Sequence, residues 1–266
     1  MTSEMVTSDL EATRSRHECL ADYFRDKVMS GGVLRCRHAD RCGAEACRVG
    51  ADFYAGQLSY LGPHYDLIQS GEALRVLIVP MEVGAGPAYV SMERRSEGVQ
   101  AVRYGTRNPH MQGVVFALQL AFGLPLSDRR ANEHLDSNHG RIHVLDAFAM
   151  ANLRLCSLAG PGKTSKATSI VSENCFEHLA ETIRILEPTL VISQGNTLHP
   201  TLSRHFTLDH EYSEHVFRAS LKGHQFIWAW FYHPTRWWDR RGRPYLRVTV
   251  EPEIKRARCL AVHCSA

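Results

Sequence analysis

Apolar residues fall along the chain in two alternating kinds of segment. Four short runs rich in β-branched and aromatic residues are predicted strands, at Leu74–Val79, His143–Met150, Leu190–Ser193 and Phe226–Phe231. Three longer stretches with apolar positions at helical spacing are predicted helices, at Leu10–Met29, Gly113–Phe122 and Glu173–Leu186. Strands that alternate with helices predict a mainly parallel sheet covered by helices on both faces. The predicted fold class is therefore α/β, with three layers α/β/α and a central, mainly parallel four-stranded sheet.

The length and composition predict one large domain, because 266 residues with 44% hydrophobic content suffice for one well-buried core. We expect an N-terminal helical segment at 1–35, the main domain with its cysteines at 36–250, and a C-terminal tail at 251–266. No stretch approaches the roughly twenty apolar residues that span a bilayer, and Met1–Leu20 lacks the apolar middle of a signal peptide. We therefore expect a cytoplasmic protein with no membrane partner.

Polar residues or a glycine stand where the four predicted strands end. In chain order these positions are Glu82, Asn152, Gly195 and His233. Ligands of open parallel sheets bind beyond the carboxyl ends of the strands, so the four positions predict one ligand site. The net charge of +3 is too small to identify a nucleic-acid partner by itself.

The segments at these ends resemble a known series of motifs. They are Pro80–Gly84, Asn152–Cys156, Glu187–Asn196 and His233–Arg236. Their order resembles that of the uracil-DNA glycosylase superfamily, and most of all its iron-sulfur branch. In that branch an Asn is followed after three residues by a cysteine, and another cysteine opens the next helix, as Cys156 and Cys175 do here. The resemblance extends over Cys36–Arg243 and implies an enzyme that flips a base out of DNA and hydrolyses its glycosidic bond.

The resemblance implies roles for three of these residues. His233 matches the histidine that stabilises the departing base as a neutral donor, and its alternative role is an ordinary loop histidine. Asn152 matches the amide that reads the pyrimidine edge, and its alternative role is to cap a turn. Glu82 matches the position that orients the attacking water. A shifted alignment would put Gly84–Ala88 at that position and leave Glu82 as a solvated turn residue.

The base-stacking position departs from the family. Relatives carry a Pro-Phe pair ahead of the next helix, whereas this chain has Pro109, His110 and Met111. We expect His110 or Met111 to line the stacking face and Met81 to contact the base. This altered pocket favours a modified pyrimidine, such as a hypermodified phage cytosine, alongside uracil. Both DNA repair and antiviral defence are compatible with it.

Eight cysteines in a reducing compartment favour a metal site over disulfides. The resemblance implies that Cys156 and Cys175 bind a [4Fe-4S] cluster of structural rather than redox function. The other two ligands would come from the upstream cysteines Cys36, Cys42 and Cys47. Any two of these three could serve, with Cys36 and Cys42 preferred because a glycine follows Cys42. Zinc bound by the same sulfurs, or ordinary buried thiols, are the alternatives.

Expected DNA contacts lie in three loops. The segment after His233 mixes arginines, which suit phosphates, with tryptophans, which suit bases, and the resemblance places it in the minor groove. Its expected contacts are Thr235, Arg236, Trp237 and Arg240, with burial in the core as the alternative for Trp237. The expected contacts in the other two loops are Lys163, Lys166 and Asn196.

These patterns together predict a monomeric, monofunctional DNA glycosylase, a hydrolase that releases a flipped pyrimidine and leaves an abasic site. No protein partner is inferred. One alternative is a catalytically silent DNA-binding module with the glycosylase fold. Another is a metal protein that binds small nucleotides at Gly84–Pro87. The sequence does not identify the excised base or the strand preference.

Overall fold

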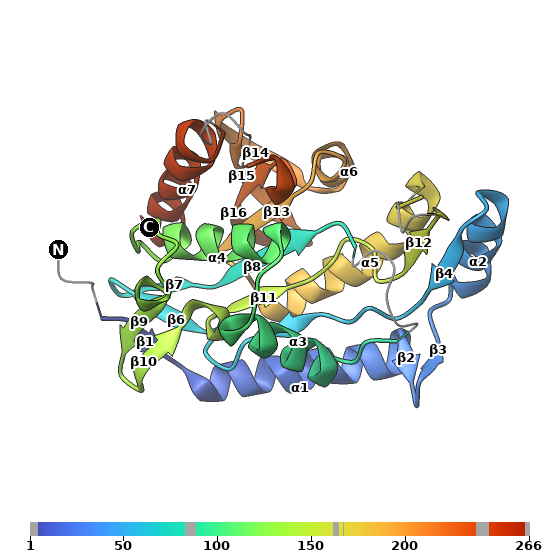
Figure 1. The fold of residues 1–266 in the computed structure, drawn as a ribbon, viewed down its shortest axis with the longest axis horizontal. Coiled ribbons are helices and arrows are strands. Elements are labelled where there is room, and N and C mark those ends of the chain that lie inside the picture. The colour runs from blue at the N-terminus through green and yellow to red at the C-terminus, as the bar shows by residue number, and fades with distance from the viewer. Residues whose placement is uncertain (1–4, 83–88, 162–164, 167, 238–244, 264–266) are drawn as a thin grey trace.

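The computed structural model describes residues 5–82, 89–161, 165–166, 168–237 and 245–263 (Figure 1). The α-helices in these ranges are α1 (Leu10–Lys27), α2 (Ala39–Arg48), α3 (Met92–Tyr104), α4 (Pro109–Ala121), α5 (Ser169–Leu186), α6 (Leu198–His205) and α7 (Glu251–His263). The 3₁₀ turns are η1 (Arg130–Asn132), η2 (Val144–Asp146) and η4 (Pro234–Arg236), and a π-helical turn is η5 (Leu246–Val250). The strands are β1 (Thr7–Ser8), β2 (Met29–Ser30), β3 (Val33–Leu34), β4 (Asp52–Tyr54), β5 (Tyr60–Leu61), β6 (Leu67–Gln69), β7 (Glu72–Leu74), β8 (Val76–Pro80), β9 (His134–Ser137), β10 (Gly140–His143), β11 (Phe148–Met150), β12 (Ser157–Ala159), β13 (Leu190–Gln194), β14 (Thr207–Ser213), β15 (Val216–Leu221) and β16 (His224–Phe231).

A seven-stranded mixed sheet forms the centre of the molecule, in the order β14-β15-β16-β13-β8-β11-β5. Strand β13 pairs in parallel with both β16 and β8, and β11 pairs in parallel with β8. The hairpin of β14 and β15 extends one edge in antiparallel fashion, and β5 extends the other. The four mutually parallel strands therefore end on the same side of the sheet.

The predicted α/β class is confirmed, and the sheet is larger than predicted. The predicted strands at 74–79, 190–193 and 226–231 correspond to β8, β13 and β16. The strand predicted at 143–150 is only partly correct, because residues 144–146 form η2 and the strand is Phe148–Met150. In η2 the Asp146 carboxylate accepts hydrogen bonds from Gln100 and Arg103, both at 2.8 Å. Strand β14 was not predicted because most of its residues are exposed, so it lacks an apolar run.

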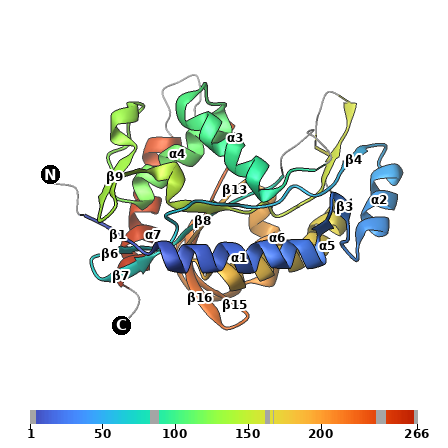
Figure 2. The ribbon, with the colours of Figure 1, turned by 90° about the horizontal axis from the view of Figure 1, so that it is seen from below.

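Helices pack on both faces of the large sheet. On one face, Val76 and Ile78 of β8 join a hydrophobic cluster with α4 and α7. On the other face, Leu77 and Val79 join a second cluster with α1, α5 and α6. Successive residues of a strand point to opposite faces, so one apolar run supplies both cores. Figures 1 and 2 show α1 lying beside α5, in agreement with the contacts between these helices.

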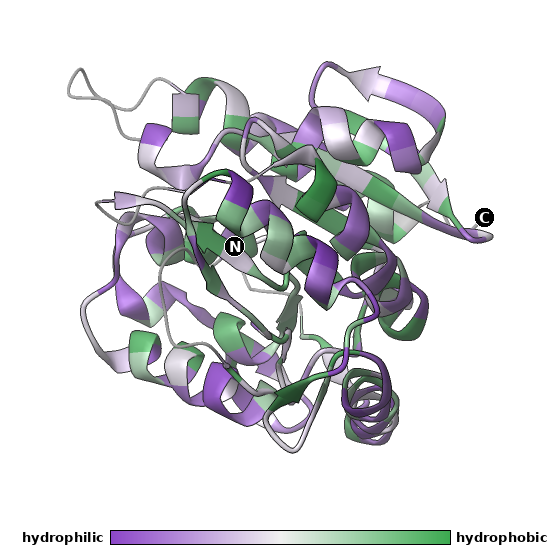
Figure 3. Cartoon of the chain, turned by 90° about the vertical axis from the view of Figure 1, so that its right-hand side faces the viewer, coloured by the Kyte–Doolittle hydropathy of each residue, from purple (hydrophilic) through white to green (hydrophobic). Residues whose placement is uncertain are grey.

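Hydropathy follows this arrangement. Figure 3 shows central strands that are largely hydrophobic, surrounded by helices on which hydrophobic and hydrophilic residues alternate. Amphipathic helices of this kind bury one stripe against a core. Among the helices of the described ranges, none is long and apolar enough to cross a membrane.

Both terminal segments contribute to the cores. Leu20 and Phe24 of α1 are fully buried in the second cluster. The expectation of a C-terminal tail at 251–266 is wrong for Glu251–His263, which forms α7 and packs against α4. The apolar residues of α7 in the first cluster include Ile254, Ala257 and Ala261. Their spacing is helical, and it was the signal in the sequence that could have identified this helix.

Gly113 of α4 provides the space in which Pro234 of η4 packs. A Cβ atom at position 113 would overlap the Cβ and Cγ atoms of Pro234 and lie 3.4 Å from the Trp237 ring. We predict that Gly113→Ala lowers the free energy of unfolding by about 1–3 kcal/mol, because the overpacking outweighs the gain in helix propensity. Urea unfolding of the purified protein measures the change.

Gly43→Ala in α2 is the matched control, because a Cβ at this position would meet no atom within 4 Å. Its expected effect is an unchanged free energy of unfolding or an increase of up to about 1 kcal/mol. If both variants shift the unfolding midpoint equally, close packing between Gly113 and Pro234 is not important for stability.

Candidate functional site

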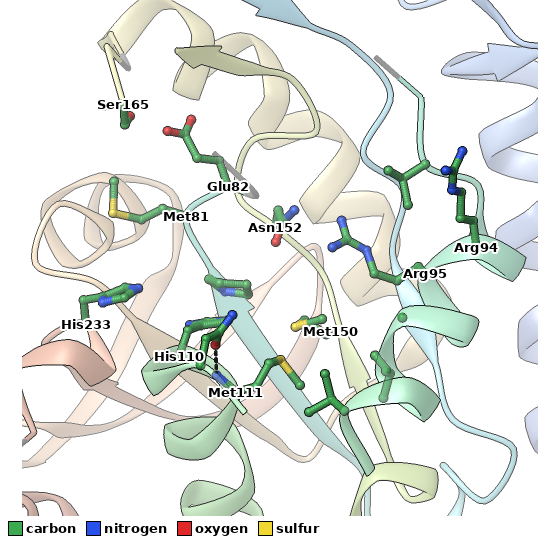
Figure 4. Close-up of a pocket in the computed structure, with 16 residues that line it drawn as sticks. Met81, Glu82, Arg94, Arg95, His110, Met111, Met150, Asn152, Ser165 and His233 are labelled. Carbon is green, nitrogen blue, oxygen red and sulfur yellow. Dashed lines mark hydrogen bonds between the residues drawn. The ribbon is translucent and has the colours of Figure 1, made fainter. Parts of the chain in front are cut away.

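A cavity of about 620 Å³ opens where the parallel strands end (Figure 4). Its walls come from the ends of β8 and β11, the residue His233 beyond β16, helix α3 and the start of α4. The lining residues are Pro80, Met81, Glu82, Val90, Arg94, Arg95, Gly98, Val99, Val102, Asn108, His110, Met111, Met150, Asn152, Ser165 and His233. All six residues predicted for catalysis and base binding therefore line one cavity, at the place where open sheets bind ligands. Gly195, at the end of β13, is not among the lining residues.

His233 is fixed by the turn that follows it. The backbone N–H of Thr235 donates to His233 Nδ1 at 3.3 Å, and Thr235 Oγ1 lies 2.9 Å from the same nitrogen. Because Nδ1 accepts a hydrogen bond, the neutral ring carries its proton on Nε2. Burial lowers the pKa of His233, which favours this neutral form. His233 is therefore a neutral donor at the cavity wall.

His110 packs against His233 from the start of α4. Asn108 caps this helix by accepting a hydrogen bond from the Met111 N–H at 2.8 Å, and Pro109 occupies the first turn. The rings of His110 and His233 are stacked, with centroids 5.4 Å apart and planes 16° apart. Burial, followed by the charges of His233 and Arg95, lowers the pKa of His110 to about 4. The stacking of two neutral rings thus helps to orient His233.

Asn152 lies just beyond β11 and is almost completely buried, with 5% of its surface exposed. The adjacent backbone is held to β8, because the Ala151 N–H donates to Ile78 O at 3.1 Å and the Leu153 N–H donates to Pro80 O at 2.9 Å. The side-chain Nδ2 of Asn152 has no hydrogen-bond partner among the described residues. A buried amide without a partner costs free energy, so the cavity offers a polar ligand an unsatisfied donor.

Glu82 forms a buried ion pair with Arg154, a residue that sequence reasoning missed. Arg154 Nε donates to Glu82 Oε2 at 2.8 Å, and the two side chains are only 3% and 5% exposed. Arg154 Nη1 also donates to Ser172 Oγ of α5 at 2.9 Å. The second carboxylate oxygen, Oε1, is buried and has no partner in the part of the chain that is described. The pair therefore fixes the carboxylate at the cavity wall and leaves one oxygen for a further interaction.

Several other lining residues were not predicted. Arg95 of α3 extends toward Asn152, whereas Arg94 points away from it (Figure 4). Met150 lies beside the predicted Met111 and adds to the apolar floor, and Ser165 lies at the rim near Glu82. Arg95 lies outside every motif considered in the sequence, and its proximity to Asn152 depends on how α3 packs.

The predicted DNA contacts fall into three groups. Thr235 and Arg236 are exposed beside His233, and the Arg236 guanidinium lies 5.8 Å from the centre of the Tyr232 ring. Lys166 and Asn196 are also exposed. Lys163 and Arg240 lie outside the described residues, as does the turn at 84–87.

Trp237 contradicts its predicted role as a DNA contact. Its side chain is fully buried, and its indole N–H donates to Tyr232 O at 2.8 Å. The ring packs edge-on against Phe231, with centroids 6.2 Å apart. A tryptophan held in this way cannot insert into DNA, because a large aromatic ring gains more from burial in the core. The prediction is therefore wrong, and the alternative of a core residue is correct.

Four of the five predicted metal ligands lie near one another at the end of the molecule that carries α2. Cys42, Cys156 and Cys175 are buried, and Cys36 is half-buried. A hydrogen bond with Cys156, followed by burial, raises the pKa of Cys175. Burial, with the charges of Cys42 and Cys175 as further causes, raises the pKa of Cys36 to about 11. Cys47 is exposed on α2, so the structure favours Cys36 and Cys42 as the upstream pair.

His178 of α5 contacts this cysteine group and was not predicted to do so. Its Nε2 lies 3.2 Å from Cys36 Sγ, and its Nδ1 lies 2.7 Å from the Tyr23 hydroxyl. Within the part of the chain that is described, no three His, Cys, Asp or Glu side chains are arranged to hold a metal ion. The four thiols are nevertheless donors of the type that zinc and iron-sulfur clusters use. The raised pKa values of Cys36, Cys42 and Cys175 disfavour their thiolates unless a cation is bound, so the donor chemistry fits a metal and the cofactor stays a prediction.

The chain matches no model of a known protein family and no curated protein.

Removing Arg154 should leave the Glu82 carboxylate buried without its partner. We predict that Arg154→Met lowers the free energy of unfolding by about 3–5 kcal/mol, and that the double variant Arg154→Met/Glu82→Gln recovers much of this loss. Urea unfolding of both proteins measures the difference. Arg25→Met is the control, because Arg25 pairs with Asp22 and Asp26 at the surface, where ion pairs contribute about 1 kcal/mol or less. Equal losses for the Arg154 and Arg25 variants would show that the buried pair has no special importance.

Proposed function

We propose that the protein is a monofunctional DNA glycosylase that hydrolyses the glycosidic bond of a flipped pyrimidine, either uracil or a modified base. The observation that carries this proposal is the convergence of His233 and Asn152 on one cavity. The first offers a neutral N–H donor, and the second offers a buried amide nitrogen that no described residue contacts by a hydrogen bond. These are the groups needed to stabilise a departing base and to read its pairing edge.

The topology supports the resemblance to the uracil-DNA glycosylase superfamily. The four motif segments lie at β8, β11, β13 and β16, the mutually parallel strands of the sheet: Asn152–Cys156 and His233–Arg236 follow β11 and β16, Pro80–Gly84 begins at the last residue of β8, and Glu187–Asn196 contains β13. Helices on both faces of these strands correspond to the three-layer α/β/α class. We include that fold class and the superfamily in the proposal.

The proposed reaction adds water to C1′ of the sugar and breaks the bond between C1′ and the base. The base leaves with the bonding electron pair and takes up a proton, and an abasic site remains. His233 Nε2–H would donate to the base oxygen on which negative charge develops. Glu82 Oε1 is available to accept a hydrogen bond from the attacking water. No lysine is among the described lining residues, which favours hydrolysis over attack by an amine.

The surface near His233 suits a nucleic-acid strand. Thr235 and Arg236 are exposed on the turn that positions His233, and Lys166 and Asn196 are exposed on neighbouring loops. Arginine and lysine neutralise phosphates, so these residues are the proposed contacts to the DNA backbone. This places the proposed backbone contacts beside the proposed catalytic histidine.

Cys36, Cys42, Cys156 and Cys175 would hold a [4Fe-4S] cluster, with zinc as the alternative. Such a group would supply structural cross-linking, since glycosidic hydrolysis requires no redox step. Cys156 ends the segment that begins at Asn152, and Cys175 lies in α5. The four residues would thereby tie the N-terminal segment to the loop that carries Asn152.

His233→Ala should abolish base release and leave DNA binding and stability nearly unchanged. We predict a fall in the rate of release of at least about 100-fold, because the donor to the departing base is lost. The assay measures free bases by mass spectrometry after incubation with uracil-containing DNA and with phage DNA that carries modified cytosines.

His210→Ala is the matched control, because His210 is exposed on β14 and is not a lining residue of the cavity. Unchanged release by the His233 variant contradicts its assigned role. If the wild-type protein releases no base but binds DNA with strong dependence on salt, the catalytically silent binding module replaces the glycosylase.

The metal proposal has its own test. We predict that anaerobically purified protein contains about four iron and four sulfide per chain for a [4Fe-4S] cluster, or about one zinc for the alternative. Cys156→Ser should lose the metal and Cys47→Ser should retain it, because Cys156 is buried beside Cys175 and Cys47 is exposed. Elemental analysis measures the metal content of each protein, and visible absorbance detects an iron-sulfur cluster. Metal-free wild-type protein, or equal loss in the two variants, contradicts the proposed site.

A further inference from the structure

Arg95 is held with its guanidinium directed into the cavity. It lies in the first turn of α3, a helix capped by Ser91, whose hydroxyl accepts a hydrogen bond from the Arg94 N–H at 3.2 Å. Arg95 Nε donates to the backbone carbonyl of Leu58 at 3.1 Å. Figure 4 shows its side chain extending toward Asn152. One donor of Arg95 is therefore used to position the group, and its terminal nitrogens lie at the cavity.

No carboxylate among the described residues pairs with Arg95. Burial alone lowers the pKa of Arg95 to about 10, so the side chain still carries a positive charge at neutral pH. Arg154 and Arg107, whose side chains are buried, differ from Arg95 because they pair with Glu82 and Glu133. A half-buried cation without an anion loses part of its hydration at a cost in free energy, so Arg95 is a positive charge that an anionic ligand would stabilise.

The position of Arg95 relative to His233 and Asn152 identifies the part of the base that it faces. In the proposed function, His233 contacts the base oxygen next to the glycosidic bond and Asn152 contacts the pairing edge. Arg95 lies across the cavity from His233, with Asn152 between them (Figure 4). In the pyrimidine ring, the atoms that follow N3 of the pairing edge are C4 and C5. Arg95 therefore faces the substituents at these two atoms.

The size of the cavity leaves room for a substituent at that edge. A volume of about 620 Å³ falls within the range of about 300–1,000 Å³ that holds ligands considerably larger than a single pyrimidine ring. A guanidinium has five N–H donors and no acceptor, and its planar fork matches a carboxylate or phosphate. It therefore suits an oxygen acceptor at this edge and disfavours the bare amino group of cytosine.

We propose that Arg95 is a specificity residue that selects pyrimidines bearing an acidic, oxygen-rich substituent at C5. This inference rests on the proposed glycosylase function and deepens it by naming the substrate class. The acidic group would supply the anion that Arg95 lacks, and the substituent would occupy the space beyond Asn152. In this proposal Arg95 recognises the substituent at C5, and Asn152 recognises the pairing edge of the base.

The experiment compares synthetic oligonucleotides that each carry one uracil, one 5-methyluracil, one 5-hydroxymethyluracil or one 5-carboxyuracil. Base release is measured by mass spectrometry and binding by fluorescence anisotropy, for the wild-type protein and for Arg95→Gln and Arg95→Lys. We expect the wild type to prefer 5-carboxyuracil. Arg95→Gln should lower kcat/KM for that base by about 10- to 100-fold, the effect of losing a hydrogen bond to a charged group, while changing the value for uracil much less. Arg95→Lys should retain part of the preference.

Arg14→Gln is the charge-matched control, because Arg14 is 70% exposed on α1 and is not a lining residue of the cavity. Thermal unfolding of each variant establishes that it is folded. Base release without preference among substituents, or an equal loss for all bases in Arg95→Gln, overturns the role of Arg95 and leaves the glycosylase proposal intact.

Release of no base from any oligonucleotide overturns the glycosylase proposal instead, and anisotropy then decides the role of Arg95. Tighter binding of the 5-carboxyuracil oligonucleotide that disappears in Arg95→Gln supports it, and equal binding of all four oligonucleotides overturns it.

Discussion

Parallel pairing of β16, β13, β8 and β11 is the constraint on which the candidate site depends. Parallel strands place their carboxyl ends on the same side of a sheet, so residues far apart in the chain converge there. Hydrogen bonds from Ala151 to Ile78 and from Leu153 to Pro80 continue this pairing past the end of β11. They fix Asn152 beside the segment that carries Glu82. The site is therefore held by the backbone of the sheet, which is more rigid than a loop.

The polar groups of the cavity differ in how many of their hydrogen bonds and ion pairs are formed within the protein, and these differences indicate their roles. Glu82 and Arg154 neutralise each other in the interior. Within the described ranges, Asn152 Nδ2 and Glu82 Oε1 are buried without hydrogen-bond partners, and Arg95 pairs with no carboxylate. A folded protein retains such groups at a net cost, most often where a ligand completes their hydrogen bonds. These three groups are a donor, an acceptor and a cation, so they suit a polar and partly anionic ligand.

The cavity and the cysteine group share one segment of chain. Residues 152–156 begin at the cavity with Asn152, contribute Arg154 to the buried ion pair and end at Cys156. Arg154 also contacts Ser172 of α5, the helix that carries Cys175 and His178. A displacement of the cysteine group would therefore displace Asn152 as well, because residues 152–156 connect the two directly.

The sequence by itself determined the elements that are marked by a continuous run of apolar residues. Continuous apolar runs identified β8, β13 and β16, because strands of a parallel sheet are buried on both faces. The order of polar residues at the strand ends also indicated that Glu82, Asn152 and His233 would meet. Only the tertiary structure decided that Trp237 is a core residue, that Glu251–His263 is a packed helix and that Arg95 enters the cavity. The reason is physical: a local pattern records whether a segment has an apolar face, whereas the partner of a given side chain is set by the long-range packing of helices and strands against one another.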